Sequence, residues 1–274
     1  MLSNVPISKT GKLIKVLYKP SPDFLREICT MKKLTFLIPF TFWALIGFSQ
    51  KSYSINTAVF SAVTITNNGI SLVPAFSLGK PATLFDLSVQ RKKFSFDPQL
   101  AFGMQDAKPW YFVFWMRYKL IESSKFNLGL GVHPGFLFSP LTLNLNGINK
   151  EYITTSRFFV GCLTPNYSLT KDISIGLYLQ QARGYNSDLK NGGLYGINMN
   201  FSSIPVGKHF FIRSSPQLYF LNNDGAKGSY LSTSITVSKQ HSPFSVSTLL
   251  NAKIKSKIPG DNFLWNVSLS YILL

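Results

Sequence analysis

After residue 50 the sequence consists of segments of about ten to thirteen residues in which large apolar side chains alternate with small or polar ones. A side-chain period of two is typical of β-strands, and this part of the chain shows no sustained helical period. Two kinds of connection separate the segments, and the two kinds alternate strictly. Five connections are short and polar, and six are longer and rich in Gly, Asn, Asp, Lys or Pro. Eleven connections predict twelve antiparallel strands.

The segment ISLVPAFSL at 70–78 is assigned to the first long loop, although a strand there would change the count, which leaves a range of about 10–14 strands. The short connections are QRKK at 90–93, ESSK at 122–125, TKD at 170–172, GKH at 207–209 and KQHS at 239–242, and the long ones begin at 66, 103, 139, 184, 222 and 255. The strands are expected at 52–66, 82–90, 93–103, 109–120, 125–138, 152–169, 172–183, 192–204, 209–222, 228–239, 242–254 and 262–274.

Short turns on one side and long loops on the other, with an even number of strands, are typical of transmembrane β-barrels. A tilted strand crosses the hydrocarbon layer with about 9–11 residues, and most of the predicted strands are at least that long. Because lipid does not tolerate an unpaired strand edge, a spanning sheet closes on itself. We therefore expect an all-β, antiparallel, up-and-down transmembrane barrel with both ends on the side of the short turns.

The last segment, FLWNVSLSYILL at 263–274, shows the alternation most clearly. Across the predicted strands, one face carries Phe112, Leu128, Ile175 and Trp265, whereas the other is rich in Gly, Ser, Asn and charged residues. We predict that the apolar face contacts lipid and that the polar face lines the lumen. Aromatic residues near strand ends are expected to form girdles at the membrane interfaces, namely Trp110, Phe138, Tyr152, Phe220, Phe263, Trp265 and Tyr271.

An export signal supports the membrane interpretation. The segment MKKLTFLIPFTFWALIGFSQ at 31–50 has two lysines, an apolar core of about fifteen residues and a plausible cleavage site at its end. This core is shorter than the roughly 20 residues of a spanning helix, and Pro39 interrupts it. Residues 31–50 are thus predicted to be a signal peptide, residues 1–30 an upstream extension absent from the mature protein, and residues 51–274 the barrel.

Residues 51–274 resemble Gram-negative outer-membrane β-barrel proteins, and the terminal strand is similar to the C-terminal insertion signal of that class. Members usually end on an aromatic residue, whereas here Tyr271 is the last aromatic residue and Leu274 ends the chain. The resemblance implies an integral position in the outer membrane, contact with lipid and lipopolysaccharide, and insertion by the barrel-assembly machinery. We expect either a porin-like channel for small solutes or a structural barrel with a charged lumen.

Charged residues of the polar face are the candidate constriction. Asp86 and Asp97 flank the QRKK turn symmetrically, so they are expected to lie directly opposite one another. Since two facing carboxylates repel, a cation should lie nearby, and the next hairpin brings Arg117 to Asp97, with Lys119 one pleat along. Such residues either select solutes or form an interior ion-pair row that fixes the register and fills the lumen.

Four further basic residues are assigned to the lumen. Six cations against two acids leave an excess of about four positive charges, which predicts an anion preference if the barrel conducts. The additional candidates are Arg157, Arg213, Lys253 and Lys255.

The remaining composition argues against several other functions. The formal net charge is +17, but the basic residues are scattered and no helix or zinc motif presents them to nucleic acid. The two cysteines, Cys29 and Cys162, fit neither a disulfide framework nor a metal site, and no cofactor motif is found. Cys162 alternates with Phe158 and Val160 and is predicted to face lipid.

Two alternative functions remain open at the level of sequence. A lipid-processing outer-membrane enzyme would need a histidine, but His209 and His241 lie in short turns, and His133 in the lumen lacks His-x-Ser spacing. No catalytic residue is therefore assigned. A secreted, lipocalin-like soluble barrel would also show alternating strands, with the apolar face turned inward around an apolar ligand.

Overall fold

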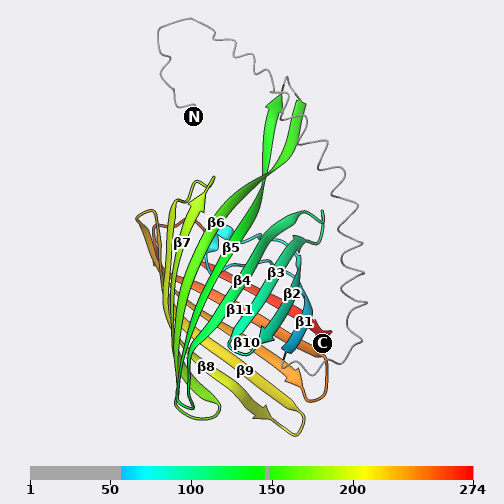
Figure 1. The fold of residues 1–274 in the computed structure, drawn as a ribbon. Coiled ribbons are helices and arrows are strands. Elements are labelled where there is room, and N and C mark those ends of the chain that lie inside the picture. Colours follow the sequence, from blue (N-terminus) through cyan, green and yellow to red (C-terminus); the bar gives the residue numbers. More distant parts are fainter. Residues whose placement is uncertain (1–56, 146–147, 274) are drawn as a thin grey trace, which may run out of the picture. The chain divides into compact units, whose positions relative to one another are not determined.

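The computed structural model describes residues 57–145 and 148–273. The predicted upstream extension and signal peptide, residues 1–50, lie outside this part of the chain. Twelve strands and one short 3-10 helix make up the described residues (Figure 1): β1 (Thr57–Thr66), η2 (Pro74–Phe76), β2 (Ala82–Arg91), β3 (Phe94–Gly103), β4 (Pro109–Glu122), β5 (Phe126–Leu145), β6 (Ile148–Ser168), β7 (Ile173–Tyr185), β8 (Asn191–Val206), β9 (Phe210–Asn223), β10 (Ala226–Lys239), β11 (Phe244–Ser256) and β12 (Phe263–Ile272).

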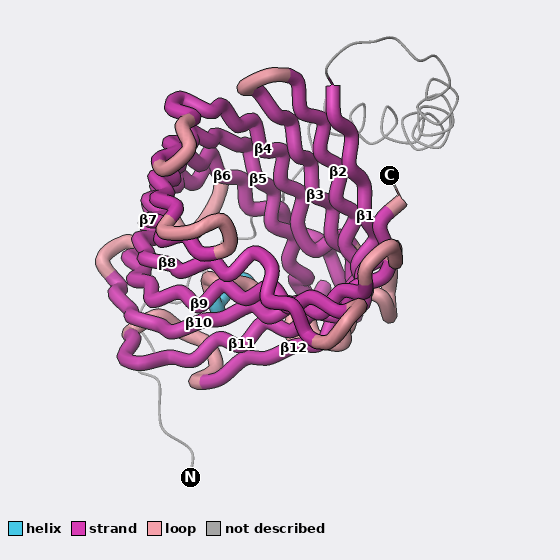
Figure 2. Tube along the Cα trace, turned by 90° about the horizontal axis from the view of Figure 1, so that it is seen from below, coloured by secondary structure: helices cyan, strands magenta, loops and turns pink. Residues whose placement is uncertain are grey.

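Each strand pairs in antiparallel fashion with its neighbours in sequence, and β1 pairs with β12 to close the barrel. The closing ladder runs from Ala62 opposite Ile272 to Thr66 opposite Ser268. Figure 2 shows the ring of strands in a view from one end. The prediction of a twelve-stranded up-and-down barrel is confirmed, and the described strand ends agree with the predicted ones to within a few residues except in β5 and β6. The predicted start of the first strand, at residue 52, lies outside the described residues.

The segment at 70–78 forms no strand. It contains only η2, at Pro74–Phe76, so the count of twelve holds. Within residues 57–145 and 148–273, no helix is long and apolar enough to span a bilayer.

The β5–β6 hairpin is longer than predicted. Residues 139–150 were expected to form a loop because of Pro140 and the Asn-Gly pair, but the ladder continues from Ser139 opposite Thr154 to Leu145 opposite Ile148. The alternation of Leu141, Thr142 and Leu143 continues the strand pattern beyond the proline. The hairpin projects past the ends of the neighbouring strands (Figure 1).

The apolar residues of each strand form the outer face. In β12 the side chains of Trp265 and Val267 are 49% and 47% exposed, whereas Leu264 and Asn266 between them are 7% and 9% exposed. Apolar side chains of this size each favour leaving water by roughly 1.5–3 kcal/mol. A coat of such residues around the whole ring is compatible with lipid and not with water.

The outward position also holds for the other residues that define the apolar face. Phe112 pairs with Phe136, Leu128 with Pro165, and Ile175 with Met199, each on the face opposite the lumen positions. The alternative of a soluble lipocalin-like barrel is therefore wrong, because the apolar residues do not point together into a shared dry centre.

Candidate functional site in the barrel lumen

The inner face of β2, β3 and β4 carries the predicted charged residues. The β2–β3 hairpin turns over Lys92 and Lys93, one residue later than predicted, and Lys92 adopts a left-handed φ of 53°. As a result Asp86 pairs with Gln99 rather than with Asp97. The expected direct opposition of the two carboxylates is wrong, because a shift of one residue at the turn moves every partner along the ladder.

The two carboxylates have different partners. Asp97 accepts hydrogen bonds from Ser88 and Ser95 and forms an ion pair with Arg117. Asp86 accepts a hydrogen bond from the Gln99 amide, and no ion pair of Asp86 occurs among the described residues. The contact between Arg117 and Asp97 is thus present as expected, but it does not extend to Asp86.

Arg117 also lies over an aromatic ring. Its guanidinium carbon is 4.6 Å from the centroid of Trp115, whose other neighbour is His133 with ring centroids 4.1 Å apart. Lys119, two residues further along β4, pairs with Glu122 at 3.0 Å. These contacts place an arginine, a tryptophan and a histidine in one layer of the inner wall, next to the charged end of β4.

Glycines provide the space for this layer. A Cβ atom at Gly131 would lie 2.8 Å from Cys162 Sγ and 3.1 Å from the Trp115 ring. At Gly129 a Cβ would lie 2.6 Å from the Thr164 hydroxyl. Side chains larger than glycine at these positions would therefore collide with residues that point into the lumen.

Cys162 lies on the inner face, because it pairs with Gly131 and is buried. The prediction that it faces lipid is wrong. In β6 the residues Phe158, Val160 and Cys162 all point inward, although each is apolar, and the outer positions between them include Phe159 and Leu163, which are exposed. Both phases of this strand are apolar, so alternation alone does not distinguish them.

The four additional basic candidates divide between the two faces. Arg213 pairs with Thr236, and Lys253 with Tyr230, at inward-facing positions. By contrast, Arg157 pairs with Phe136 and with Tyr185, which is exposed on the outer face, so its inward assignment is wrong.

Lys255 is also on the outer face. A β-bulge at Ser229 and Tyr230 shifts the register of β10 against β11, so Lys253 pairs with Tyr230 and Lys255 with Ser229. The two lysines therefore lie on opposite faces although they are two residues apart. Of the predicted lumen charges, four cations and two carboxylates remain inside, and the excess falls from about four to about two.

The connection between β1 and β2, residues 67–81, crosses the barrel interior near the loop end, and we call it the strap. Figure 2 shows its short helix inside the ring of strands. On one wall Leu72 and Val73 pack against a buried cluster, and the Tyr219 hydroxyl lies 2.6 Å from the Leu72 carbonyl oxygen. On the other wall, Trp110 Nε1 donates a hydrogen bond to the carbonyl oxygen of Phe76 at 2.9 Å.

Trp110 is therefore not part of an interfacial girdle. A register shift between Ala101 and Phe102 turns its side chain toward the strap, where it is 3% exposed and packs with Ala82 and Ala101. Four other predicted girdle residues are outward and exposed, namely Phe220, Phe263, Trp265 and Tyr271. Tyr152 is exposed too, but in β6 it shares the phase of the inward-facing Phe158 and Val160.

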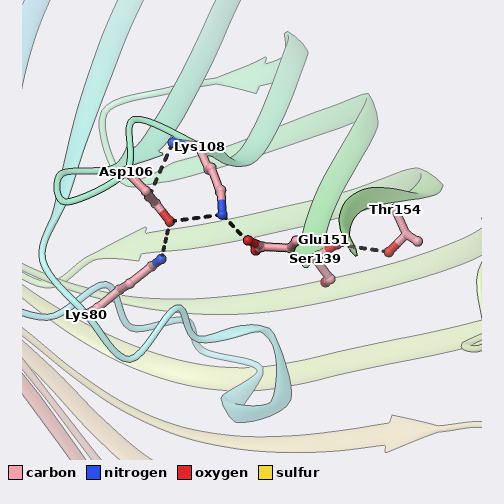
Figure 3. A network of polar contacts seen from close by, with 6 residues as sticks. All are labelled: Lys80, Asp106, Lys108, Ser139, Glu151 and Thr154. Carbon is pink, nitrogen blue, oxygen red and sulfur yellow. Dashed lines mark hydrogen bonds and ion pairs between the residues drawn. The ribbon is translucent and has the colours of Figure 1, made fainter. Parts of the chain in front are cut away.

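A polar network links the end of the strap to the β3–β4 connection and to the start of β6 (Figure 3). Lys80 donates to Asp106 at 2.8 Å, and Lys108 lies 3.8 Å from Asp106 and 2.7 Å from Glu151. The hydrogen bond from Lys80 lowers the pKa of Asp106 below its ordinary value of 3.8. The hydrogen bond to Glu151 raises the pKa of Lys108.

Two cavities lie along the lumen. A cavity of about 560 Å³ on the turn side is lined by polar and charged residues, among them Arg117, Lys119 and Asn198. A second cavity of about 370 Å³ on the loop side lies below the strap and is lined mostly by aromatic and aliphatic residues. Tyr178 borders both cavities, so they follow one another along the inner wall.

Some of the residues in this arrangement could be predicted from the sequence. Trp115 alternates with Arg117 in the polar phase of β4, and a bulky aromatic residue at such a position indicates a function in the lumen. Tyr178 and Tyr219 could have been found in the same way, since both occupy the polar phase of their strands. No comparable signal marks the path of the strap.

The described ranges, 57–145 and 148–273, contain no group of three or more His, Cys, Asp or Glu residues that could hold a metal ion. The Nδ1 atom of His133 is buried and has no hydrogen-bond partner in the described part of the chain. His133 points into the lumen as predicted, and its ring packs at a tilt against Trp115.

The closed ring and its apolar exterior decide the class of protein. A sheet without edges, coated outside with exposed apolar side chains and polar within, is the form in which β-structure spans a membrane. The chain is an integral membrane β-barrel protein.

Comparisons with known proteins agree with this architecture and assign no substrate. No protein-family model and no curated protein matches the chain. Among solved structures, the barrel is similar to the KdgM porin, with 10% identity, a TM-score of 0.47, and coverage of 78% of this chain and 98% of that one. The COG4313 outer-membrane channel from Pseudomonas putida F1 has 10% identity, a TM-score of 0.45 and coverage of 82% and 97%. LpxR from Salmonella typhimurium has 9% identity, a TM-score of 0.42 and coverage of 78% and 99%.

Proposed function

We propose that this outer-membrane barrel is a channel for small solutes. The observation that carries the proposal is the pair of cavities, about 560 Å³ and 370 Å³, that follow one another along the lumen and share Tyr178 as a border. A structural barrel of this size would be expected to fill its interior with side chains. In this barrel the inward side chains instead leave the two cavities between them.

The strap sets the width of the channel at its loop end. It is held on opposite walls by the Trp110 hydrogen bond to Phe76 and by the contact of Tyr219 with Leu72. Solutes entering from the loop side therefore have to pass this segment. The wider, polar cavity on the turn side offers hydrogen-bonding groups to hydrated solutes.

The charge of the lumen favours anions weakly. Arg117, Lys119, Arg213 and Lys253 lie inside against Asp86 and Asp97, which leaves an excess of about two positive charges. Since Arg117 is paired with Asp97 and Lys119 with Glu122, the positive charge without an ion pair among the described residues is carried by Arg213 and Lys253. A ring of positive side chains attracts anions and repels cations.

Conductance of the purified, refolded protein in a planar bilayer tests this proposal. We expect discrete channel openings and, in a KCl gradient, a reversal potential that indicates a modest preference for chloride. Bilayers that stay silent although the protein shows the heat-dependent gel shift of a folded barrel would contradict the channel. Cation selectivity would contradict the charge argument alone.

We also propose that the outer face contacts membrane lipid and lipopolysaccharide. Arg157 pairs with Tyr185 at the loop end of β7, and Lys255 is one residue from the loop end of β11, so two outward cations lie near the same rim. Lipid phosphates are suitable partners for cations at this level. The barrel-assembly machinery is the proposed partner during insertion, and depleting it should leave the protein unfolded in the periplasm.

A lipid-processing enzyme gains no support from the geometry. A histidine acting as a general base needs a partner that orients it, but the Nδ1 atom of His133 has none in the described part of the chain. If His133→Ala abolished a lipid turnover shown by the purified protein, the proposed channel function would be incomplete.

A further inference from the structure

The cavity below the strap differs from an ordinary water-filled channel segment. Its wall includes Trp115, Phe158, Val160 and Leu194 from the strands, and Phe76 covers it from the strap. Its volume of about 370 Å³ falls in the range of small-molecule pockets, roughly 300–1,000 Å³. Mostly apolar walls with a few polar groups are typical of a ligand site, because water gains little from such a space.

One polar atom in this wall is left without a partner. The Nδ1 atom of His133 is buried and makes no hydrogen bond. It lies beside Gly135, since a Cβ atom at Gly135 would be 3.2 Å from it, and both residues line the cavity. Buried polar atoms are nearly always hydrogen-bonded, so an unpartnered one in a cavity wall indicates where a ligand group binds.

The other polar groups of the wall are held in fixed positions. Tyr111 donates to the Gln99 side-chain oxygen at 2.7 Å, and Tyr178 donates to the Gln180 side-chain oxygen at 2.8 Å. Both amides therefore have their oxygens occupied. The His133 ring packs against Trp115 in a tilted arrangement, with ring centroids 4.1 Å apart, which restricts its orientation. The polar atoms are thus preorganised around an apolar volume.

We propose that this cavity binds a small aromatic molecule that carries one hydrogen-bonding group. The Phe76 and Phe158 rings contact each other, with centroids 5.7 Å apart, so the ligand ring packs beside this pair and against Val160, and its polar group contacts His133 Nδ1. Aromatic walls favour a flat ring, because ring pairs gain from offset and edge-to-face contacts beyond the area they bury. Among the fully buried side-chain atoms of this wall that the structure describes, His133 Nδ1 is the one without a partner, so the ligand is assigned a polar group at that point.

This inference goes beyond the proposed channel, because binding to the purified barrel requires no flux through it. Isothermal titration calorimetry on the full protein in detergent micelles provides the test, with empty micelles as the blank. The probes are 4-nitrophenol, at a pH where its hydroxyl is protonated, and nitrobenzene, which has the same ring and nitro group without the hydroxyl. We expect saturable binding of 4-nitrophenol, with one molecule per barrel.

Two cavity-filling variants test the location. Val160→Phe and Ala182→Leu each place extra carbon atoms in the wall, so either should weaken 4-nitrophenol binding about tenfold or more. Each variant is first checked for the heat-dependent gel shift of a folded barrel, and the second substitution keeps the test valid if the first does not fold. Unchanged affinity in a folded variant would overturn the location.

A third variant tests the polar contact. His133→Phe keeps a ring against Trp115 but removes Nδ1, so 4-nitrophenol should bind about fivefold to tenfold more weakly while nitrobenzene binds as before. The matched control is His209→Phe in the β8–β9 turn, which should change neither. Equal losses for both probes, or no saturable binding beyond the micelle blank, would overturn the proposal even if the barrel conducts.

Discussion

The two halves of the lumen are built by the same strands but offer different environments. In β4 the inward residues change along the strand from Tyr111 and Val113 near the strap, through Trp115, to Arg117 and Lys119 near the short turns. The loop-side half is apolar and crossed by the strap, whereas the turn-side half is polar and open. Alternation decides which residues face the lumen, and the order of those residues along each strand decides what the lumen binds.

Removing the strap should have the largest effect on this difference. Replacing residues 70–78 with a Gly-Ser linker of the same length removes the contacts with Trp110 and Tyr219. We expect single-channel conductance to rise about threefold or more, because the narrow half would become as wide as the other. A Gly-Ser substitution of the β10–β11 turn, residues 240–243, at the end of the barrel away from the strap, is the control. Unchanged conductance would show that the strap does not limit the pore.

The wall contact of the strap should also contribute to stability. Trp110→Ala deletes a buried ring and its hydrogen bond to Phe76. Substitutions of this kind cost about 3–5 kcal/mol in protein cores. Urea unfolding of the barrel in lipid vesicles measures the change. Trp265→Ala on the outer face is the control, and an equal loss there would mean that Trp110 has no special part in holding the strap.

The charge of the lumen can be tested with two lysines that lie two residues apart. Lys253 faces the interior and donates to the Gly260 carbonyl oxygen at 2.5 Å, whereas the bulge turns Lys255 outward. Lys253→Glu should move the reversal potential in a KCl gradient toward cation preference, and Lys255→Glu should leave it nearly unchanged. Equal shifts from both variants would contradict the bulge assignment.

The smallest expected effect is on the titration of the Asp106 carboxyl at low pH. Because Lys80 lowers the pKa of Asp106, the Asp106 contacts contribute stability above the ordinary pKa of 3.8, and this contribution is lost as the pH falls through the lower, folded-state pKa. NMR titration of the labelled aspartate carboxyls in micelles should give Asp106 a midpoint below 3.8. Lys80→Met should raise that midpoint. A midpoint above 3.8 in the unmodified protein would contradict the network.

Much of the fold was predictable because lipid imposes a simple rule on spanning strands. In β7 and β12 the apolar phase is unmistakable, and both faces were assigned correctly. Two lumen assignments failed where the rule is weakest. Lys255 follows a bulge. Arg157 and Cys162 both lie in β6, where both phases are apolar and alternation does not distinguish the two faces.

The site itself was predictable only in part. The contact of Arg117 with Asp97 follows from hairpin geometry even when the register is off by one residue, because long side chains reach a diagonal neighbour. The sequence assigns residues 70–78 to a long loop and does not predict the path of that loop. Its path depends on Trp110 and Tyr219, which lie far from it in sequence and on opposite walls. Such long-range contacts leave no periodic pattern.

The outward orientation of the apolar phase can be measured directly on β12. Single cysteines at 264, 265, 266, 267 and 268, in a background with Cys29 and Cys162 replaced by Ser, can carry a nitroxide label in lipid vesicles. Labels at 265 and 267 should be relaxed strongly by oxygen, which concentrates in lipid, and weakly by a water-soluble nickel chelate, with the neighbouring positions showing lower oxygen access. The opposite phase, or no two-residue period at all, would contradict the account.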